Sequence, residues 1–112
     1  DADGVFAMTN TVSIEPGKLD RSPTGTGLSA RMALLRAQGV MDVGDRLRMR
    51  SVIGSEFIGV IESDTSVGDL PAIVPSISGR AWQTGRFTYH VDPTDPWPLG
   101  YRLTDTWPSS QR

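Results

Sequence analysis

The stretch DRSPTGTG, residues 20–27, combines a charged turn, a proline and two closely spaced glycines. The amides of Gly25, Thr26 and Gly27 lie where a loop is predicted to become a helix. The first amides of a helix have no partner within it and lie at the positive end of its dipole. Glycine also lets an anion approach the backbone without a Cβ in the way. This stretch therefore indicates a site for a carboxylate or a phosphate.

Two other interpretations of these glycines stay open at this point. In the first, Thr24 or Thr26 caps the helix and the glycines serve only the turn. In the second, GTGLSA matches the dinucleotide-binding pattern G-x-G-x-x-G/A, with Asp45 twenty residues after Gly25. The context counts against a dinucleotide, because the preceding KLDRSP is polar and is no apolar strand. A Walker A loop is excluded, because no Gly-Lys-Ser/Thr follows.

Two groups of charged residues after the helix have simpler explanations. Arg46, Arg48 and Arg50 lie on one side of a predicted strand and could bind phosphate, but such a row is more often a solvated sheet face. Asp42 and Asp45 flank a glycine, and two carboxylates are fewer than a calcium site collects. We therefore expect a solvated face and a turn.

Composition narrows the classes of function. The net charge of −2 over 112 residues argues against broad nucleic-acid binding. No cysteine and a single histidine, His90, make a metal site improbable, and we expect none. No apolar run approaches the ~20 residues that cross a bilayer, and the first residues lack the features of a signal peptide. The expected compartment is the cytoplasm, with no membrane partner.

A helix is the element that must position the glycine amides. From Leu28 to Gln38 the apolar residues cover most of a helical circumference, which predicts a buried helix. Gly39 fits the position just past its end, where a left-handed residue closes the last turn.

Strands are predicted around this helix by alternation of apolar and polar residues. They are expected at 5–14, 46–51, 56–62, 70–74 and 80–91, with a turn at EPGK, residues 15–18. One helix among several strands predicts an α+β fold in which the sheet wraps the helix. The methionines are expected to fill the core.

The segments DRSPTGTGLSARMALLRAQG, SVIGSEFIGVI and ISGRAWQTGRFTYHVDPTDPWPLGY resemble the C-terminal half of the proline racemase family. That family contains proline racemases, 4-hydroxyproline epimerases and trans-3-hydroxy-L-proline dehydratases. The resemblance implies one half of a diaminopimelate epimerase-like fold, a barrel-like, mostly antiparallel sheet around a central apolar helix at about 27–38. It assigns 1–103 to this half and 104–112 to a tail, and it leaves open whether 86–103 belongs with the absent N-terminal half.

The resemblance also implies roles for loop residues. In racemases of the family this loop reads Asp-Arg-Ser-Pro-Cys-Gly-Thr-Gly, and its cysteine is one of two bases on opposite faces of the α-carbon. Thr24 occupies that position here, which resembles the dehydratase branch, and it is expected to hydrogen-bond the departing hydroxyl or a water. Gly25 and Thr26 are expected to donate amides to the substrate carboxylate, and Asp20 to accept a hydrogen bond from the ring amine. Leu28 stands where many relatives have threonine.

The chemistry of threonine supports the dehydratase assignment independently. A thiol can serve as a base because its pKa is about 8.5. A threonine hydroxyl does not ionise near neutral pH, so Thr24 cannot be the second base of a racemase.

We therefore expect a fragment of a cofactor-independent enzyme that dehydrates trans-3-hydroxy-L-proline to pyrroline-2-carboxylate. The alternatives are a hydroxyproline epimerase or proline racemase, and a non-catalytic carboxylate-binding module. The expected partners are a proline derivative and the absent N-terminal half, without which the chain is expected to be inactive. A homodimer is a further expectation, because an isolated half would expose apolar surface.

Overall fold

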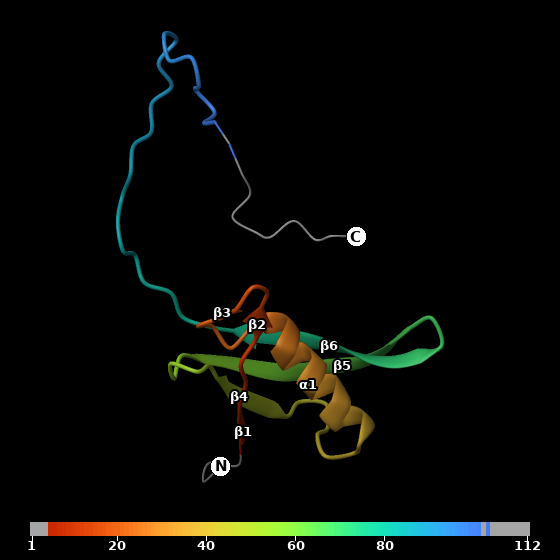
Figure 1. Cartoon of the computed structure of the whole chain (residues 1–112). Helices are drawn as coiled ribbons and strands as arrows, with labels where there is room; N and C mark the ends of the chain where they lie inside the picture. Colours follow the sequence, from red (N-terminus) through yellow and green to blue (C-terminus); the bar gives the residue numbers. More distant parts are fainter. Residues whose placement is uncertain (1–4, 102, 104–112) are drawn as a thin grey trace. The chain divides into compact units, whose positions relative to one another are not determined.

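The computed structural model describes residues 5–101 and 103. The chain divides into two units, Asp1–Ala81 and Trp82–Arg112, and each is described by itself. Every helix and strand of the described residues lies in the first unit (Figure 1). The expected tail at 104–112 lies outside the described residues.

Four strands form the main sheet in the order β1-β4-β5-β6. They are β1 (Phe6–Thr9), β4 (Arg46–Arg50), β5 (Glu56–Val67) and β6 (Leu70–Ser78). β1 pairs with β4 in parallel, and the other two pairings are antiparallel. A two-stranded hairpin of β2 (Ser13–Ile14) and β3 (Lys18–Leu19) stands apart from this sheet. A barrel-like sheet is expected from the sequence, but in the described residues the sheet is open, with β1 and β6 as its edge strands.

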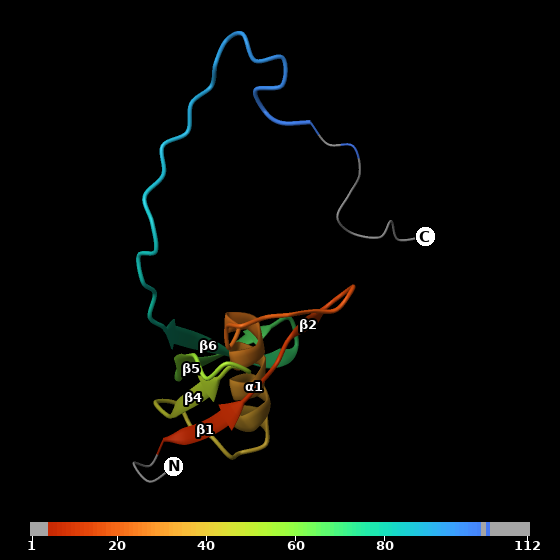
Figure 2. The same cartoon turned by 60° about the vertical axis from the view of Figure 1, so that its left-hand side comes forward.

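The helix α1 (Gly25–Ala37) lies across one face of the sheet (Figures 1 and 2). Leu28 and Met32 are fully buried against the sheet, whereas Leu34 is 47% exposed. The expectation of a helix buried on all sides is therefore wrong for the described residues, because an open sheet covers only one side of it. Gly39 follows the helix with φ 73°, the left-handed conformation expected at its end.

The core forms where α1 meets the centre of the sheet. Its buried side chains are Leu28, Met32, Met41, Leu47, Met49 and Ile61, so three of the four methionines are core residues. The helix approaches β5 so closely that a Cβ on Gly59 would lie 2.6 Å from Cε of Met32. A side chain at position 59 would therefore force Met32 to shift.

The predicted alternation of β4 is confirmed. Leu47 and Met49 are buried, while Arg46 and Arg50 are exposed. Glu56 lies 3.0 Å from Arg50 and 3.5 Å from Arg48, so the arginine row is an ion-paired, solvated face.

The other strand predictions are correct in part. The predicted strand at 5–14 is interrupted after Thr9, and β5 and β6 run further than 56–62 and 70–74. The predicted strand at 80–91 is wrong for the described residues, because no neighbouring strand pairs with it. The turn at 15–18 is confirmed, with Gly17 at φ 139° and its N–H donating to the Ile14 carbonyl at 2.8 Å.

Residues 82–101 of the second unit form no helix or strand and are exposed. Their local contacts include a stacked pair of rings, Phe87 and Tyr89, with centroids 6.4 Å apart, and an edge-on pair, Trp97 and Tyr101, at 6.2 Å. Asp92 accepts hydrogen bonds from the backbone and hydroxyl of Thr94.

Candidate active site

The loop that leads into α1 is held by three successive side-chain bonds to its own backbone. Asp20 Oδ1 accepts from the Ser22 amide at 2.8 Å, Ser22 Oγ accepts from the Thr24 amide at 3.2 Å, and Thr24 Oγ1 accepts from the Gly27 amide at 3.2 Å. Short polar side chains stabilise turns and helix starts in this way. The sequence D-x-S-x-T-x-x-G thus specifies the local shape of the loop.

Contacts with the rest of the unit anchor this loop. The Asp20 amide donates to the Val12 carbonyl at 2.9 Å, and Ser55 Oγ donates to the Arg21 carbonyl at 2.9 Å. Pro23 is fully buried. The loop is therefore tied both to the small β2–β3 hairpin and to the turn between β4 and β5.

Thr24 is the N-cap of α1, with φ 59° and ψ 127°. Positive φ is uncommon for a β-branched residue, and such strain is characteristic of functional sites. Its Oγ1 accepts the Gly27 amide, and its hydroxyl proton has no acceptor among the described residues. A hydroxyl has one proton to donate and two lone pairs, so Thr24 can cap the helix and still donate to a ligand.

The amides of Gly25 and Thr26 are placed to bind an anion. Within the described part of the chain neither has an acceptor, whereas the next two amides bond to Thr24 Oγ1 and to the Thr24 carbonyl. Two unpaired amides at a helix N-terminus attract negative charge. Capping and anion binding are therefore compatible here, since they use different amides.

The two glycines differ in what surrounds them. A Cβ on Gly25 would meet only Cδ1 of Ile77, at 3.5 Å. A Cβ on Gly27 would lie 2.6 Å from Thr24 Oγ1 and 2.9 Å from Asn10 Nδ2. Gly27 is required by packing within the unit, whereas Gly25 is not.

Hydrogen bonds from the backbone amide and the side chain of Ser22 lower the pKa of Asp20 below its ordinary value. Asp20 is therefore ionised at neutral pH and suits a protonated amine as a partner. The four predicted residues Asp20, Thr24, Gly25 and Thr26 thus lie on one braced loop and the helix start that follows it.

Sequence reasoning missed three residues that shape this site. Ser22 and Ser55 hold the loop, and Asn10 lies against Gly27. Ser22 lies within the conspicuous motif, which is a signal for its role. Nothing in the local pattern pointed to Asn10 or Ser55, because both reach the loop only through the fold.

The remaining candidate residues form no second site. Asp42 and Asp45 make the predicted turn, with the Asp45 amide donating to the Asp42 carbonyl at 3.0 Å. Residues 5–101 and 103 contain no group of three or more His, Cys, Asp or Glu that could hold a metal. In the same residues no helix is long and apolar enough to cross a membrane.

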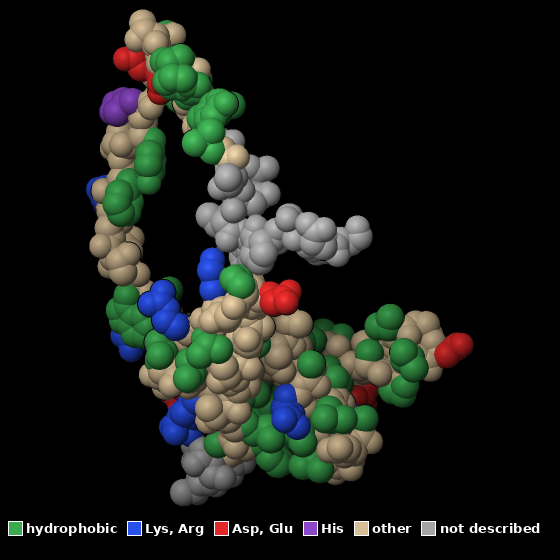
Figure 3. Space-filling view, viewed as in Figure 1, with side chains coloured by type: hydrophobic (Ala, Val, Ile, Leu, Met, Phe, Trp, Pro, Cys, Tyr) green, Lys and Arg blue, Asp and Glu red, His purple; other side chains and the backbone are tan. Residues whose placement is uncertain are grey.

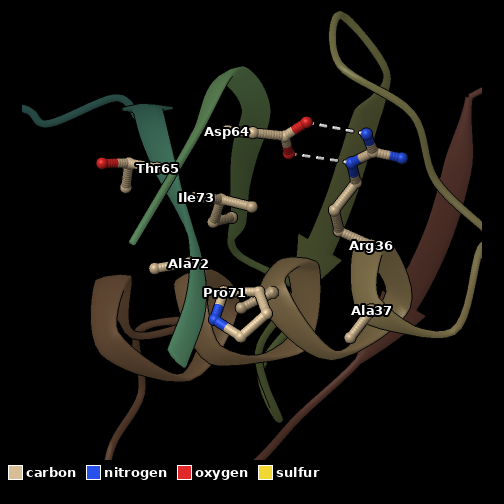
Figure 4. Close-up of a pocket in the computed structure, with 8 residues that line it drawn as sticks. Arg36, Ala37, Asp64, Thr65, Pro71, Ala72 and Ile73 are labelled. Carbon is tan, nitrogen blue, oxygen red and sulfur yellow. Dashed lines mark hydrogen bonds and ion pairs between the residues drawn. The ribbon is translucent and has the colours of Figure 1, made fainter. Parts of the chain in front are cut away.

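A hollow of about 430 Å³ lies at the other end of α1, between its last turns and the β5–β6 hairpin (Figure 4). On its wall Arg36 donates to Asp64 from Nε and Nη2, at 2.9 and 2.8 Å. The hydrogen bond from Arg36 lowers the pKa of Asp64. None of the four predicted site residues lines this hollow.

The Proline racemase family matches residues 1–102, and the chain belongs to this family. The match therefore covers the loop of residues 20–27, the main sheet and most of the second unit.

Two solved structures resemble the chain closely. A hydroxyproline epimerase from Agrobacterium vitis with bound trans-4-hydroxy-L-proline is 38% identical, with a TM-score of 0.72 over 97% of this chain. A probable proline racemase from Agrobacterium radiobacter K84 with bound carbonate is 45% identical, with a TM-score of 0.72 over 96% of this chain. The chain spans 31% of the length of each of these proteins.

Proposed function

We propose that this chain belongs to the C-terminal half of an enzyme that dehydrates trans-3-hydroxy-L-proline. The observation that carries the proposal is Thr24, which occupies the position of the second catalytic cysteine in the family's racemases and has a hydroxyl proton free to donate. Family membership supports an enzyme that acts on a small proline derivative. The reaction needs no cofactor, and the cytoplasm remains the expected compartment of the full enzyme.

In the proposed reaction the substrate carboxylate binds the amides of Gly25 and Thr26, and Asp20 accepts a hydrogen bond from the ring amine. A cysteine thiolate supplied by the N-terminal half removes the α-proton. The electron pair forms the double bond between C2 and C3, and the C3–O bond breaks. The C3 hydroxyl leaves as water by taking up the proton that the cysteine removed from the α-carbon, which regenerates the thiolate, and the enamine then tautomerises to the imine. Thr24 hydrogen-bonds the leaving hydroxyl.

Thr24 suits this role better than the role of a base. Its ionised form is out of reach near neutral pH, whereas a thiol with a pKa of about 8.5 can exchange its proton. The Gly27 amide that donates to Oγ1 polarises the hydroxyl and makes it a better donor. One base is enough for an elimination, whereas inversion of the α-carbon needs a group on each face.

The second candidate is a hydroxyproline epimerase or proline racemase. The similarity to two solved structures favours it, since one is a hydroxyproline epimerase and the other a probable proline racemase. A group other than Thr24 would then have to supply the second base. A carboxylate-binding protein without activity is a third possibility, and binding without turnover would identify it.

Proton NMR in D2O on the full-length polypeptide distinguishes these candidates. We expect trans-3-hydroxy-L-proline to be consumed with formation of a pyrroline product, while L-proline keeps its α-proton. Deuterium at the α-carbon of L-proline or of 4-hydroxy-L-proline, with formation of the other stereoisomer, would instead establish the isomerase and contradict our assignment of Thr24.

Variants of Thr24 test its role directly. We expect Thr24→Ala to slow dehydration about 100-fold, the lower end of what a positioned proton donor contributes, and Thr24→Ser to retain most of the activity. Because Thr24→Ala also removes a helix cap, thermal unfolding must show that the variant is folded at the assay temperature. Thr9→Ala, at an exposed position of β1, serves as the control. Undiminished dehydration by folded Thr24→Ala would contradict the role.

A further inference from the structure

Asn10 directly follows β1 and continues its pairing with β4, because its amide donates to the Arg50 carbonyl at 3.0 Å. Alternation along the strand places Asn10 on the same side as Phe6 and Met8, which pack against the core, and opposite to the exposed Thr9. A polar residue therefore occupies a position where the strand pattern calls for an apolar one.

The carboxamide of Asn10 lies against the start of α1. Its Nδ2 is 2.9 Å from the point that a Cβ on Gly27 would occupy, and Thr24 Oγ1 is 2.6 Å from the same point. Both side chains thus lie on the bare side of Gly27. The Gly27 amide holds the Thr24 hydroxyl, and the Asn10 carboxamide lies near the same side of Gly27.

The oxygen atom of the Asn10 carboxamide needs an explanation. Asn10 Oδ1 is buried and has no hydrogen-bond partner within the part of the chain that the structure describes. A buried acceptor without a partner is destabilising, and a leucine of nearly the same shape would avoid the penalty. The asparagine is thus a stability disadvantage that an apolar core position would not carry.

We propose that Asn10 is a positioning residue for the anion-binding loop. Its carboxamide, packed on Gly27, sets the place of the Thr24 hydroxyl and of the Gly25 and Thr26 amides. This inference rests on the proposed function, because it assumes that the loop binds the substrate carboxylate. It adds a residue from β1, outside the loop motif, to the residues that determine how the substrate is held.

The most direct test is a substitution that adds a negative charge at position 10 of the full-length polypeptide. Asn10→Asp is nearly isosteric but adds a negative charge beside the amides that would bind the carboxylate. We expect KM to rise at least tenfold with a smaller change in kcat. Thr9→Asp adds the same charge one residue earlier, on the opposite side of β1, and we expect its KM to be that of the parent. Equal KM values for Asn10→Asp and the parent would overturn the proposal.

If Asn10→Asp does not fold, a second variant tests the same role. Asn10→Leu removes the polar atoms and the unpartnered oxygen, so we expect a higher melting temperature together with a rise in KM or a fall in kcat. A more stable variant with parental kinetics would show that Asn10 has no positioning role.

Calorimetric titration with L-proline separates the failure of this inference from that of the proposed function. Binding by the parent and not by Asn10→Asp, without dehydration by either, supports the role of Asn10 and overturns the dehydratase. Dehydration by both proteins with equal KM overturns the role of Asn10 alone. A folded parent that neither binds nor converts a proline derivative overturns both.

Discussion

At the residue scale, the site depends on one loop in which each polar side chain has a separate task. Asp20 and Ser22 shape the turn, Thr24 caps the helix, and the amides of Gly25 and Thr26 have no acceptor among residues 5–101 and 103. This division explains how the capping and ligand-binding interpretations of the motif can hold together. The two glycines also differ, because a Cβ on Gly27 would meet Thr24 and Asn10, whereas a Cβ on Gly25 has room within the unit.

Alanine substitutions at the two glycines are expected to give opposite results. Gly27→Ala must displace Thr24 and Asn10, so we expect a loss of about 1–3 kcal/mol in the free energy of unfolding. Gly25→Ala has room within the unit and a better helix propensity, so we expect unchanged or slightly higher stability. Its Cβ obstructs the anion, and we expect substrate binding about tenfold weaker, or about 1.4 kcal/mol. Chemical denaturation and calorimetry measure the two effects, and equal behaviour of the two variants would contradict the separation.

At the element scale, α1 is placed by its contact with the centre of the sheet. Met32 and Leu28 pack directly on β5 at Gly59, and the parallel pairing of β1 with β4 puts α1 in the connection between them. A crossover of this kind brings the start of the helix to the end of the strand that precedes it, which is why Asn10 meets Gly27. The position of the site therefore follows from how α1 packs.

The contact at Gly59 is expected to be sensitive to a single methyl group. A Cβ there lies 2.6 Å from Cε and 2.7 Å from Sδ of Met32. We expect Gly59→Ala to lower the free energy of unfolding by about 1–3 kcal/mol, since extra atoms in a packed core force neighbours to shift. Shortening the neighbour should relieve the clash, so Gly59→Ala combined with Met32→Ala is expected to cost less than the sum of the single variants. Additive losses in denaturant unfolding would show that the two residues do not compete for the same space.

At the scale of the whole molecule, each unit exposes large hydrophobic side chains of a kind that folded proteins normally bury. In the first unit Leu34, Val67, Leu70 and Val74 are at least 45% exposed, and hydrophobic side chains gather on the turn end of the β5–β6 hairpin (Figure 3). In the second unit the rings of Trp82, Phe87, Tyr89, Trp97 and Tyr101 are all more than half exposed. Because the chain spans 31% of the two similar proteins, we propose that the rest of the polypeptide covers part of this surface.

The 112-residue chain studied alone is therefore expected to associate or to bind hydrophobic dyes, since large exposed apolar patches are typical of interfaces. Sedimentation and dye fluorescence measure this, with the full-length polypeptide as the control that binds less dye per chain. A monomer that binds no dye would contradict the prediction and the homodimer expected for an isolated half.

We also expect this chain alone to show no turnover, because its sequence contains no cysteine to act as the base.

The local sequence by itself determined the helix, its end at Gly39, the turn at Gly17 and the alternation of β4, because each depends on neighbouring residues and backbone conformation. It also determined the loop motif, whose hydrogen bonds span two or three residues. Only the tertiary structure decided that the sheet is open and that one face of α1 stays exposed. It likewise decided that 80–91 forms no strand, since a strand exists only with a partner. Asn10 and Gly27 are seventeen positions apart, so no local pattern could show that they meet.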